Sequence, residues 1–563
     1  MNERDYLSEL ARLRERSWPA GLPRSPEYPL GERPLTEYLR EWARRQPRKT
    51  ALHFYGHDTS WAELDRLSDR CAVLLEELGV GPGDRVAVFM PNCPQLHIAF
   101  WGILKLGAVY APVSPLSRGL ELAYQLNDSE AEVLLCFDQL LPVVRLVREE
   151  TPLRHVIATS LSELCPDTPE LPVPDLLRAP KLVADDALDF YSALAATKGT
   201  PPAHPPCLHA FAALNYTGGT TGLPKGCIHS HGDMLYTCAS FVPVALGLTP
   251  DSISLNFLPE FWIAGENAGL LFPVFAGCSL VLLARWDALA FLGAVQRYRV
   301  SHCGLLVDSA AEVLEHPRLD EFDLGSLQRV GAISFVKKLT PEYRRRWHER
   351  TGCNLYEFAF GMTETHTCDT FTFGLQDDDF DLRQAPTFVG LPVPGTEFKV
   401  CDFETGELLP LGTEGELCLR SPSLFKGYWR RPEASTEVLR EGWLRTGDLG
   451  VIDAQGFIRY LGRRKEMLKV NGMSVFPSEL EALLGQHPAI LASAVIGRPD
   501  PERGQQPVAF IVLHPGSGES AEGLAAWCRE SMAGYKVPEI RLVEALPMTA
   551  TGKVKKNELE ALL

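Results

Sequence analysis

The stretch Tyr216–Gly226 constrains the chain more than any other; it reads Tyr-Thr-Gly-Gly-Thr-Thr-Gly-Leu-Pro-Lys-Gly. Its glycines allow tight backbone turns that bring N–H groups close to an anion. The threonine hydroxyls add hydrogen-bond donors, and Lys225 adds a compact positive charge. The composition therefore predicts a loop that holds a polyphosphate.

This loop differs from the P-loop of nucleotide-binding proteins, which has four residues between its glycines and then Gly-Lys-Ser/Thr. Here Gly226 follows Lys225, and Pro224 disfavours a helix that begins at the lysine. The alternative interpretation is a mobile Gly/Thr loop on the surface. The motifs downstream favour the phosphate loop.

Four further motifs follow in order: Phe358-Ala-Phe-Gly-Met-Thr-Glu364, Gly442-Trp-Leu-Arg-Thr-Gly-Asp448, Gly462-Arg-Arg-Lys-Glu-Met-Leu-Lys-Val-Asn-Gly472 with Pro477-Ser-Glu-Leu-Glu481, and Pro547-Met-Thr-Ala-Thr-Gly-Lys553. Together with the loop they resemble the superfamily of adenylate-forming enzymes, which includes acyl- and aryl-CoA synthetases, adenylation domains and luciferases. The resemblance extends from about Leu35 to the end of the chain, and among these enzymes the chain is most similar to bacterial fatty-acid and related aliphatic acid CoA ligases.

The resemblance implies an acid-thiol ligase that uses ATP, Mg²⁺ and coenzyme A. A carboxylate attacks the α-phosphate of ATP, releasing pyrophosphate and leaving an acyl-adenylate. A thiol, usually that of coenzyme A, then attacks the acyl carbon and releases AMP. Neither step needs a protein nucleophile, so catalysis is expected from positioning and charge neutralisation.

Roles follow motif by motif from the same resemblance. Lys553 is the expected catalytic residue of adenylation, Glu364 the magnesium ligand, and Thr363 a contact to the phosphate end of the nucleotide. Lys465 occupies the hinge position. The β- and γ-phosphates are expected to contact Thr217, Gly218, Gly219, Thr220, Thr221, Gly222 and Lys225; the remaining nucleotide and coenzyme A contacts are expected from Gly331, Ala332, Phe360, Gly361, Met362, Asp448, Arg463, Lys469 and Gly472.

The acid pocket departs from the family pattern. The segment Leu258–Gly265 has Trp262 where the family has histidine, and we expect Phe261, Trp262 and Gly265 beside the acyl group. Leu270, Leu271, Phe272 and Phe275 are expected as an apolar wall. The wall favours an aliphatic or aromatic tail, whereas a bulky indole favours a short, branched or hydroxylated acid. Glu260 and Glu266 add carboxylates nearby, for which a solvent-facing position stays open.

Composition limits the class of protein. A chain of 563 residues needs more than one domain. A net charge of −17 argues against nucleic acid as a partner, because no basic surplus exists to neutralise phosphates. The 14 scattered cysteines and the absence of a signal peptide predict free thiols in a cytoplasmic enzyme. The uncharged run Asn267–Ala284 is broken by Pro273 and Gly277, so we predict a buried helix, a turn and a strand, with no transmembrane segment.

Hydrophobic patterns place the secondary structure. Ser60 caps a helix that extends to about Leu78; further helices are expected at 95–106, 121–127 and 477–484, and strands at 85–90, 108–111, 132–137, 398–400, 416–420, 456–460, 492–495 and 508–513. Proline-rich residues 200–206 form a linker or surface loop. The predicted fold class is α/β, with two parallel-type αβ sheet subdomains and a small β-barrel-like subdomain in residues 1–461, then a small mobile α+β domain in residues 462–563.

Several alternatives stay open. A stand-alone enzyme that loads an aryl or amino acid onto a carrier protein has the same motifs, although the chain ends ten residues after Lys553 with no fused carrier. A catalytically silent nucleotide- or acyl-binding protein is a third interpretation. His229 and His231 alone make a weak metal site. The acid, a homodimeric assembly and the pathway also stay open.

Overall fold

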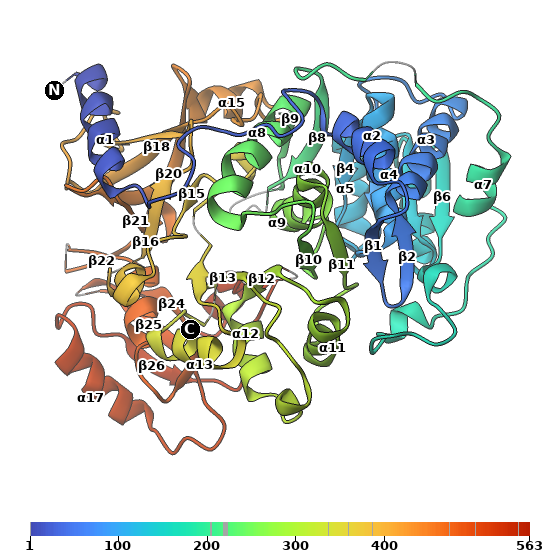
Figure 1. Ribbon diagram of the computed structural model, residues 1–563. Coiled ribbons are helices and arrows are strands. Elements are labelled where there is room, and N and C mark those ends of the chain that lie inside the picture. The colour runs from blue at the N-terminus through green and yellow to red at the C-terminus, as the bar shows by residue number, and fades with distance from the viewer. Residues whose placement is uncertain are drawn as a thin grey trace.

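The computed structural model describes residues 2–202, 205–217, 223–335, 337–358, 360–384, 387–471, 473–501, 503–549 and 551–563. Two mostly parallel sheets, a curled antiparallel sheet and a C-terminal sheet follow one another in space (Figure 1). The C-terminal sheet lies beside the curled sheet and the second parallel sheet (Figure 1). The predicted fold class is therefore confirmed.

The first sheet has the order β7-β6-β5-β3-β4-β8-β9, and its pairs are parallel except the last. Its strands are buried on both faces, as parallel strands covered by helices must be. They span Arg85–Phe89 (β3), Val109–Pro112 (β4), Val133–Phe137 (β5), His155–Thr159 (β6), Leu188–Asp189 (β7), Phe211–Tyr216 (β8) and Gly226–Ser230 (β9). The covering helices include Trp61–Glu77 (α3), Pro94–Leu106 (α4), Gly119–Ser129 (α5), Leu141–Val147 (α6), Phe190–Ala196 (α7) and His231–Phe241 (α8).

The second sheet has the order β14-β13-β12-β10-β11-β1-β2, so two strands from near the N-terminus complete it. Only the β1–β2 pair is antiparallel. The strands span Thr50–Phe54 (β1), His57–Ser60 (β2), Ile253–Asn256 (β10), Ser279–Leu282 (β11), His302–Leu306 (β12), Arg329–Ile333 (β13) and Leu355–Glu357 (β14). Helices Leu35–Arg45 (α2), Ala288–Tyr298 (α11), Val307–Glu315 (α12) and Pro341–Thr351 (α13) accompany it.

The uncharged run between the two sheets is helical and buried, as predicted. After Ile263–Gly265 (α9), it covers the π-helical turns Glu266–Leu271 (η6) from Asn267 onward and Phe272–Ala276 (α10), and then turns at Gly277 into β11. A π-helical segment is rare and occurs often at functional sites. No helix in the described ranges combines the length and the apolar composition that a bilayer crossing requires.

The curled sheet has the order β15-β16-β21-β20-β18-β17, with β19 on β20. Its strands span Thr370–Phe371 (β15), Phe388–Pro392 (β16), Glu397–Cys401 (β17), Gly415–Arg420 (β18), Leu439–Arg440 (β19), Trp443–Ile452 (β20) and Ile458–Arg463 (β21). The N-terminal helix Glu3–Ser17 (α1) packs on this sheet and buries Tyr6 and Leu10 in its core (Figure 1). The short helices Phe380–Arg383 (α14) and Pro432–Val438 (α15) lie in its connections.

The C-terminal sheet has the order β23-β22-β25-β24, with β26 on β25. Its elements are Leu468–Val470 (β22), Met473–Val475 (β23), Pro477–Leu484 (α16), Ile490–Asp500 (β24), Gly504–Leu513 (β25), Ala521–Ser531 (α17), Glu539–Leu542 (β26) and Lys556–Glu560 (α18). The chain leaves the curled sheet at Arg463 and enters the C-terminal sheet at Leu468. Lys465, in the turn Arg464–Glu466, lies in this passage.

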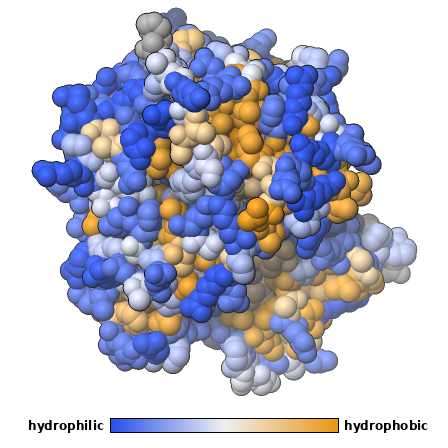
Figure 2. All heavy atoms as spheres, turned by 90° about the vertical axis from the view of Figure 1, so that its right-hand side faces the viewer, coloured by the Kyte–Doolittle hydropathy of each residue, from blue (hydrophilic) through white to orange (hydrophobic). Residues whose placement is uncertain are grey.

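The surface on the side of the first sheet carries apolar side chains among polar ones (Figure 2). Large exposed apolar residues of this subdomain include Leu120 of α5 and Val183, each 90% exposed. All 14 cysteines have free thiols, in agreement with the prediction, and most of them are buried.

Candidate active site

The predicted phosphate loop connects the antiparallel strands β8 and β9, so a strand and not a helix follows Lys225. Hydrogen bonds join its two ends: the Thr217 N–H donates to the Lys225 carbonyl at 2.9 Å, and the Lys225 N–H donates to Thr217 Oγ1 at 3.3 Å. Residues 218–222, with Gly218, Gly219, Thr220, Thr221 and Gly222, lie outside the described residues. These two hydrogen bonds between Thr217 and Lys225 thus close the base of the loop.

Tyr428 connects Lys225 with Glu364. The Lys225 ammonium lies 4.8 Å from the centre of the Tyr428 ring, and the Tyr428 hydroxyl donates to Glu364 Oε1 at 2.7 Å. Burial, together with the Glu364 charge, raises the pKa of Tyr428, so the phenol stays protonated and donates. Tyr428 belongs to none of the predicted motifs, and no local pattern in the sequence indicates its role.

The turn Thr363–Thr365 that carries Glu364 is fixed on two sides. His229 Nε2 donates to the Thr363 carbonyl at 2.7 Å, and the Phe425 N–H donates to the Glu364 carbonyl at 2.8 Å. The next three residues all have left-handed backbones, with φ of 59°, 55° and 64° at positions 366–368. A side chain at Gly361 would lie 2.5 Å from the Cys368 nitrogen, so only glycine fits there. The tight turn holds Glu364 in one place.

The Glu364 carboxylate suits a magnesium ion better than a metal held entirely by protein groups. The described residues contain no cluster of three or more His, Cys, Asp or Glu side chains arranged to hold a metal. Mg²⁺ usually takes one or two carboxylates and completes its shell with substrate phosphates and water. Glu364, with Thr363 beside it, fits this pattern next to a phosphate loop.

Asp448 and Arg463 face each other on paired strands. They are register partners on β20 and β21, and Arg463 Nε lies 2.9 Å from Asp448 Oδ1. Burial raises the pKa of Asp448 to about 7, although the Arg463 charge opposes the shift. The ring centre of Phe360 lies 6.0 Å from that of Tyr460, and Tyr460 is on β21 with Arg463. Aromatic surface and a carboxylate therefore lie close together, as adenosine requires.

Lys553 reaches this site from the C-terminal domain. Its loop is closed by hydrogen bonds with Thr549, and its ammonium lies 5.5 Å from the centre of the Phe335 ring. Desolvation, and then the Arg463 charge, lower the pKa of Lys553, while the charges of Asp448, Glu466 and Glu364 oppose the shift. The side chain nevertheless stays accessible to solvent. The charges of Glu364, Asp448 and Arg463 thus all act on Lys553.

Aromatic rings crowd the region next to Phe335. Trp262 lies 5.9 Å from Phe335, ring centre to ring centre. The Phe358 ring covers β12 and β13 where these strands have glycines: a Cβ on Gly331 would lie 2.1 Å from Phe358 Cε1, and one on Gly304 2.7 Å from Phe358 Cε2. The space that the two glycines leave open is therefore filled by the ring of Phe358.

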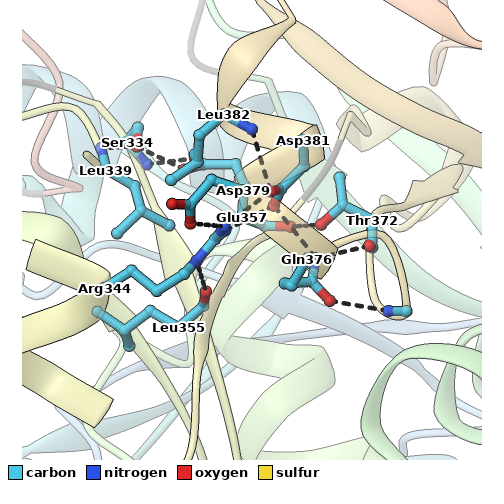
Figure 3. A network of polar contacts seen from close by, with 11 residues as sticks. Ser334, Leu339, Arg344, Leu355, Glu357, Thr372, Gln376, Asp379, Asp381 and Leu382 are labelled. Atoms are coloured by element: carbon cyan, nitrogen blue, oxygen red, sulfur yellow. Dashed lines mark hydrogen bonds and ion pairs between the residues drawn. The ribbon is translucent and has the colours of Figure 1, made fainter. Parts of the chain in front are cut away.

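A polar network fixes the segment that carries Phe335 (Figure 3). The Ser334 N–H and hydroxyl donate to the two carboxylate oxygens of Glu357 at 2.8 and 2.6 Å. Below them, the buried Arg344 guanidinium forms ion pairs with Asp381 at 2.7 Å and Asp379 at 2.8 Å (Figure 3). The loop after β13 is thereby joined to the end of β14.

Comparisons with known proteins agree with this arrangement. The family described as AMP-binding enzyme matches residues 39–429, and the AMP-binding enzyme C-terminal domain matches residues 479–553. The chain belongs to the AMP-binding enzyme family. It is similar to a long-chain-fatty-acid–CoA ligase of Bacillus subtilis, with 32% identity over 95% of both chains, and to a feruloyl-CoA synthase of Amycolatopsis, with 32% identity over 92% of this chain and 96% of the relative.

Among solved structures, an anthranilate CoA ligase in complex with anthranoyl-AMP superimposes with a TM-score of 0.81 at 28% identity, over 94% of this chain and 97% of the other. The predicted resemblance to acyl-CoA synthetases is thus confirmed, and so is the prediction of an AMP-forming acid-thiol ligase. The relatives named here act on different acids, so they leave the acid of this AMP-binding enzyme open.

The structure places the predicted site residues of this AMP-binding enzyme in several parts of the fold. Those brought close to one another are Thr217, Lys225, Phe360, Thr363, Glu364, Asp448, Arg463 and Lys553. Gly331 and Ala332 lie on β13, where the Ala332 carbonyl accepts a hydrogen bond from the Phe358 N–H at 2.6 Å. Lys469 lies on β22 in the C-terminal sheet, and Gly472 lies outside the described residues. The roles of these residues stay predictions.

The structure also fixes several side-chain positions that the sequence left open. Glu260 and Glu266 are fully buried. Phe275 is buried and stacks on Tyr38 of α2, with 5.4 Å between the ring centres. Lys556, three residues after Lys553, pairs with Glu466 at 2.8 Å and with Glu481 at 3.4 Å.

The structure also shows the surroundings of His229 and His231. His229 is buried, and its hydrogen bond to the Thr363 carbonyl gives it a structural role in the turn that carries Glu364. Burial lowers the pKa of His231 to about 4, so this imidazole is neutral. Neither histidine belongs to a group of metal-binding side chains in the described part of the chain.

Proposed function

We propose that this enzyme activates a carboxylic acid with ATP and magnesium and transfers the acyl group to coenzyme A, forming an acyl-CoA, AMP and pyrophosphate. One observation carries the proposal: the Lys553 ammonium, far along the chain from Glu364 and Asp448, lies 5.5 Å from the centre of the Phe335 ring after β13, near enough to both carboxylates for their charges to act on it. Carboxylates that would bind metal and ribose thus share one site with a cation suited to the reacting phosphate and acid.

In the first half-reaction, an oxygen of the acid forms a bond to the α-phosphorus while the bond to pyrophosphate breaks. Lys225 and the loop it closes hold the departing phosphates. Glu364 and Thr363 would hold magnesium, which neutralises phosphate charge when bound. The accessible ammonium of Lys553 contacts the α-phosphate and the attacking carboxylate, where negative charge must be stabilised.

In the second half-reaction, the thiolate of coenzyme A forms a bond to the acyl carbon, and AMP leaves. The two reactions need different groups at the same place. We assign Lys465 as the hinge, because it lies in the passage between the curled and C-terminal sheets. Rotation there withdraws Lys553 and presents the segment with Lys469 and Gly472 to the acyl-adenylate. Motions of this kind often limit turnover.

The acid that we propose is compact: a short, branched or aromatic one. Phe358 occupies the space beside Gly304 and Gly331, and Trp262 packs on Phe335 next to Lys553. We infer that these rings leave less room for a long unbranched tail than for a compact acid. The relatives act on long-chain, feruloyl and anthranilate substrates, so the pocket of this chain decides the preference.

The test is pyrophosphate release with MgATP across short, branched, long-chain, hydroxylated and aromatic acids, followed by transfer to coenzyme A or to a carrier-bound phosphopantetheine. We expect release with a compact acid and transfer to coenzyme A. Transfer to the carrier alone would establish the carrier-loading alternative. Release only with long-chain acids would contradict the proposed pocket but not the reaction.

A further inference from the structure

A buried polar chain joins three segments of the site. The Asn215 amide donates to Glu266 Oε2 at 2.6 Å, and Glu266 Oε1 lies 3.4 Å from His366 Nε2. All three side chains are inaccessible to solvent. Within the described residues, Asn215 Oδ1, Glu266 Oε1 and both ring nitrogens of His366 have no hydrogen-bond partner, so the Glu266–His366 contact is a close polar approach and not a hydrogen bond. Loss of the Glu266 carboxylate would leave the buried Asn215 amide unpaired as well.

Each member belongs to a different functional segment. Asn215 lies on β8, two residues before Thr217 at the base of the phosphate loop. Glu266 begins the π-helical turns η6, directly after the segment that contains Trp262. His366 follows Glu364 by two residues. The chain thus connects the loop for the phosphates, the segment beside the acid and the turn for magnesium.

The last member is held firmly in the turn. The Asn267 amide, next to Glu266, donates to the His366 carbonyl at 2.9 Å. The His366 ring also meets the His229 ring edge to face at 4.8 Å, and His229 donates to the Thr363 carbonyl. A shift of η6 would therefore also shift the backbone on both sides of Glu364, at Thr363 and at His366.

We propose that Glu266 is a positioning residue, which fixes the Glu364 turn relative to the phosphate loop through His366 and Asn215. The inference rests on the proposed function, because it concerns the binding of MgATP at that site. Glu266 is fully buried, and the role assigned to it is to hold other segments and not to contact the nucleotide. It acts by holding the separation of two segments that grip the same triphosphate.

The expected loss of MgATP affinity on replacing Glu266 can be bounded from the behaviour of other enzymes. Outer residues that orient a metal ligand usually change metal affinity or activity by about 10- to 100-fold when replaced. A displacement of about 1 Å at a reacting centre costs about 100-fold in rate. Loss of the Glu266 carboxylate leaves the Asn215 amide without its acceptor, so the two segments lose their only described side-chain link through η6.

Glu260 supplies a matched control. It is equally buried, lies six residues earlier and pairs with a histidine as well, His97 at 3.0 Å. Its other partners are Asn92 and Asn256, which belong to neither the phosphate loop nor the Glu364 turn. Replacing either glutamate removes a buried carboxylate of the same layer. Among the described polar contacts of the two glutamates, only those of Glu266 reach β8 and the turn that carries Glu364.

The experiment compares Glu266→Leu, Glu266→Gln and Glu260→Leu in the full chain. Calorimetry measures the Kd of MgATP in the absence of acid, and hydrogen exchange measures the protection of the backbone amides of residues 363–368. We expect Glu266→Leu to weaken MgATP binding about 10-fold or more and to speed exchange in that turn. Glu266→Gln, whose amide oxygen still accepts from Asn215, should restore most of the affinity.

Equal losses of MgATP affinity in Glu266→Leu and Glu260→Leu would overturn the proposal, because they would indicate a general effect on stability. Unchanged affinity and exchange in a folded Glu266→Leu would overturn it too. If Glu266→Leu does not fold, Asn215→Leu and His366→Leu are read by the same two measurements. Wild-type protein that binds MgATP in this manner but releases no pyrophosphate with any acid would refute the proposed function alone.

Discussion

Replacement of Lys553 by alanine removes a cation that, in the proposed function, the C-terminal domain brings to the reacting groups. The ammonium lies on a loop closed by two hydrogen bonds with Thr549, and it is held next to Phe335. Both hydrogen bonds use backbone groups of residue 553 and not its side chain, so the variant should keep the loop and lose only the charge. The effect is therefore attributable to electrostatics at the α-phosphate.

Its size can be bounded. A unit charge about 4 Å from another contributes about 4 kcal/mol at the effective dielectric constant near a protein surface. Lys553 stays accessible in this conformation, so solvent screening reduces that figure. Loss of one preorganised donor at a transition state costs about 2.7–4 kcal/mol. We expect about 2–4 kcal/mol, a loss of roughly 30- to 1000-fold in the rate of adenylation.

The assay separates the two half-reactions. Adenylation is followed as pyrophosphate release in single turnovers, and thioester formation starts from supplied acyl-adenylate and coenzyme A. Lys553→Ala should slow the first and leave the second nearly unchanged. Lys555→Ala is the control, because Lys555 pairs with Glu558 on the surface and should affect neither. Equal losses in both half-reactions would refute the role assigned to Lys553.

Three further perturbations follow from the same contacts. Tyr428→Phe removes the hydrogen bond to Glu364, worth about 1.5–3 kcal/mol for a charged acceptor, so the Mg²⁺ concentration for half-maximal adenylation should rise about 10-fold or more; an unchanged value would contradict the link. The pKa of Asp448 is raised to about 7, and only the ionised form accepts from both ribose hydroxyls, so ATP affinity should increase between pH 6 and 8 and this dependence should be absent in Asp448→Asn. The same raised pKa makes the folded chain retain a proton that the unfolded chain releases, so the contribution of Asp448 to the free energy of unfolding falls as pH rises from about 4 to 7. Arg344→Met leaves Asp379 and the buried Asp381 without their ion-pair partner, so it should lower the free energy of unfolding by about 3–5 kcal/mol in denaturant titrations. A loss below about 1 kcal/mol would contradict the burial of the pair with Asp381.

Much of the fold could be predicted because its signals are local. The alternating strands and helices around β3, α4 and β5 lie within a few residues of their predicted bounds, since apolar runs and Gly or Pro breaks mark them. The capping hydroxyl of Ser60 accepts from the Glu63 N–H at 3.2 Å, as the pattern indicated. Motif order located Glu364, Asp448 and Lys553 in the same way.

What the sequence did not reveal depends on contacts between distant segments. Tyr428 and Glu364 are 64 residues apart, and Glu266 and His366 are 100 apart. No periodicity or turn preference records such pairs. The burial of Glu266 was unforeseen for the same reason: its partners come from β8 and from the turn after Glu364, and only the packing of the two sheets brings them together.

The most direct test of the central claim is the exchange of labelled pyrophosphate into ATP, measured without coenzyme A. We expect exchange that requires both magnesium and a compact carboxylic acid, and that falls at least 30-fold in Lys553→Ala. Exchange of equal rate in Lys553→Ala, or MgATP binding with no exchange for any acid, would contradict the claim that these residues couple an acid to AMP.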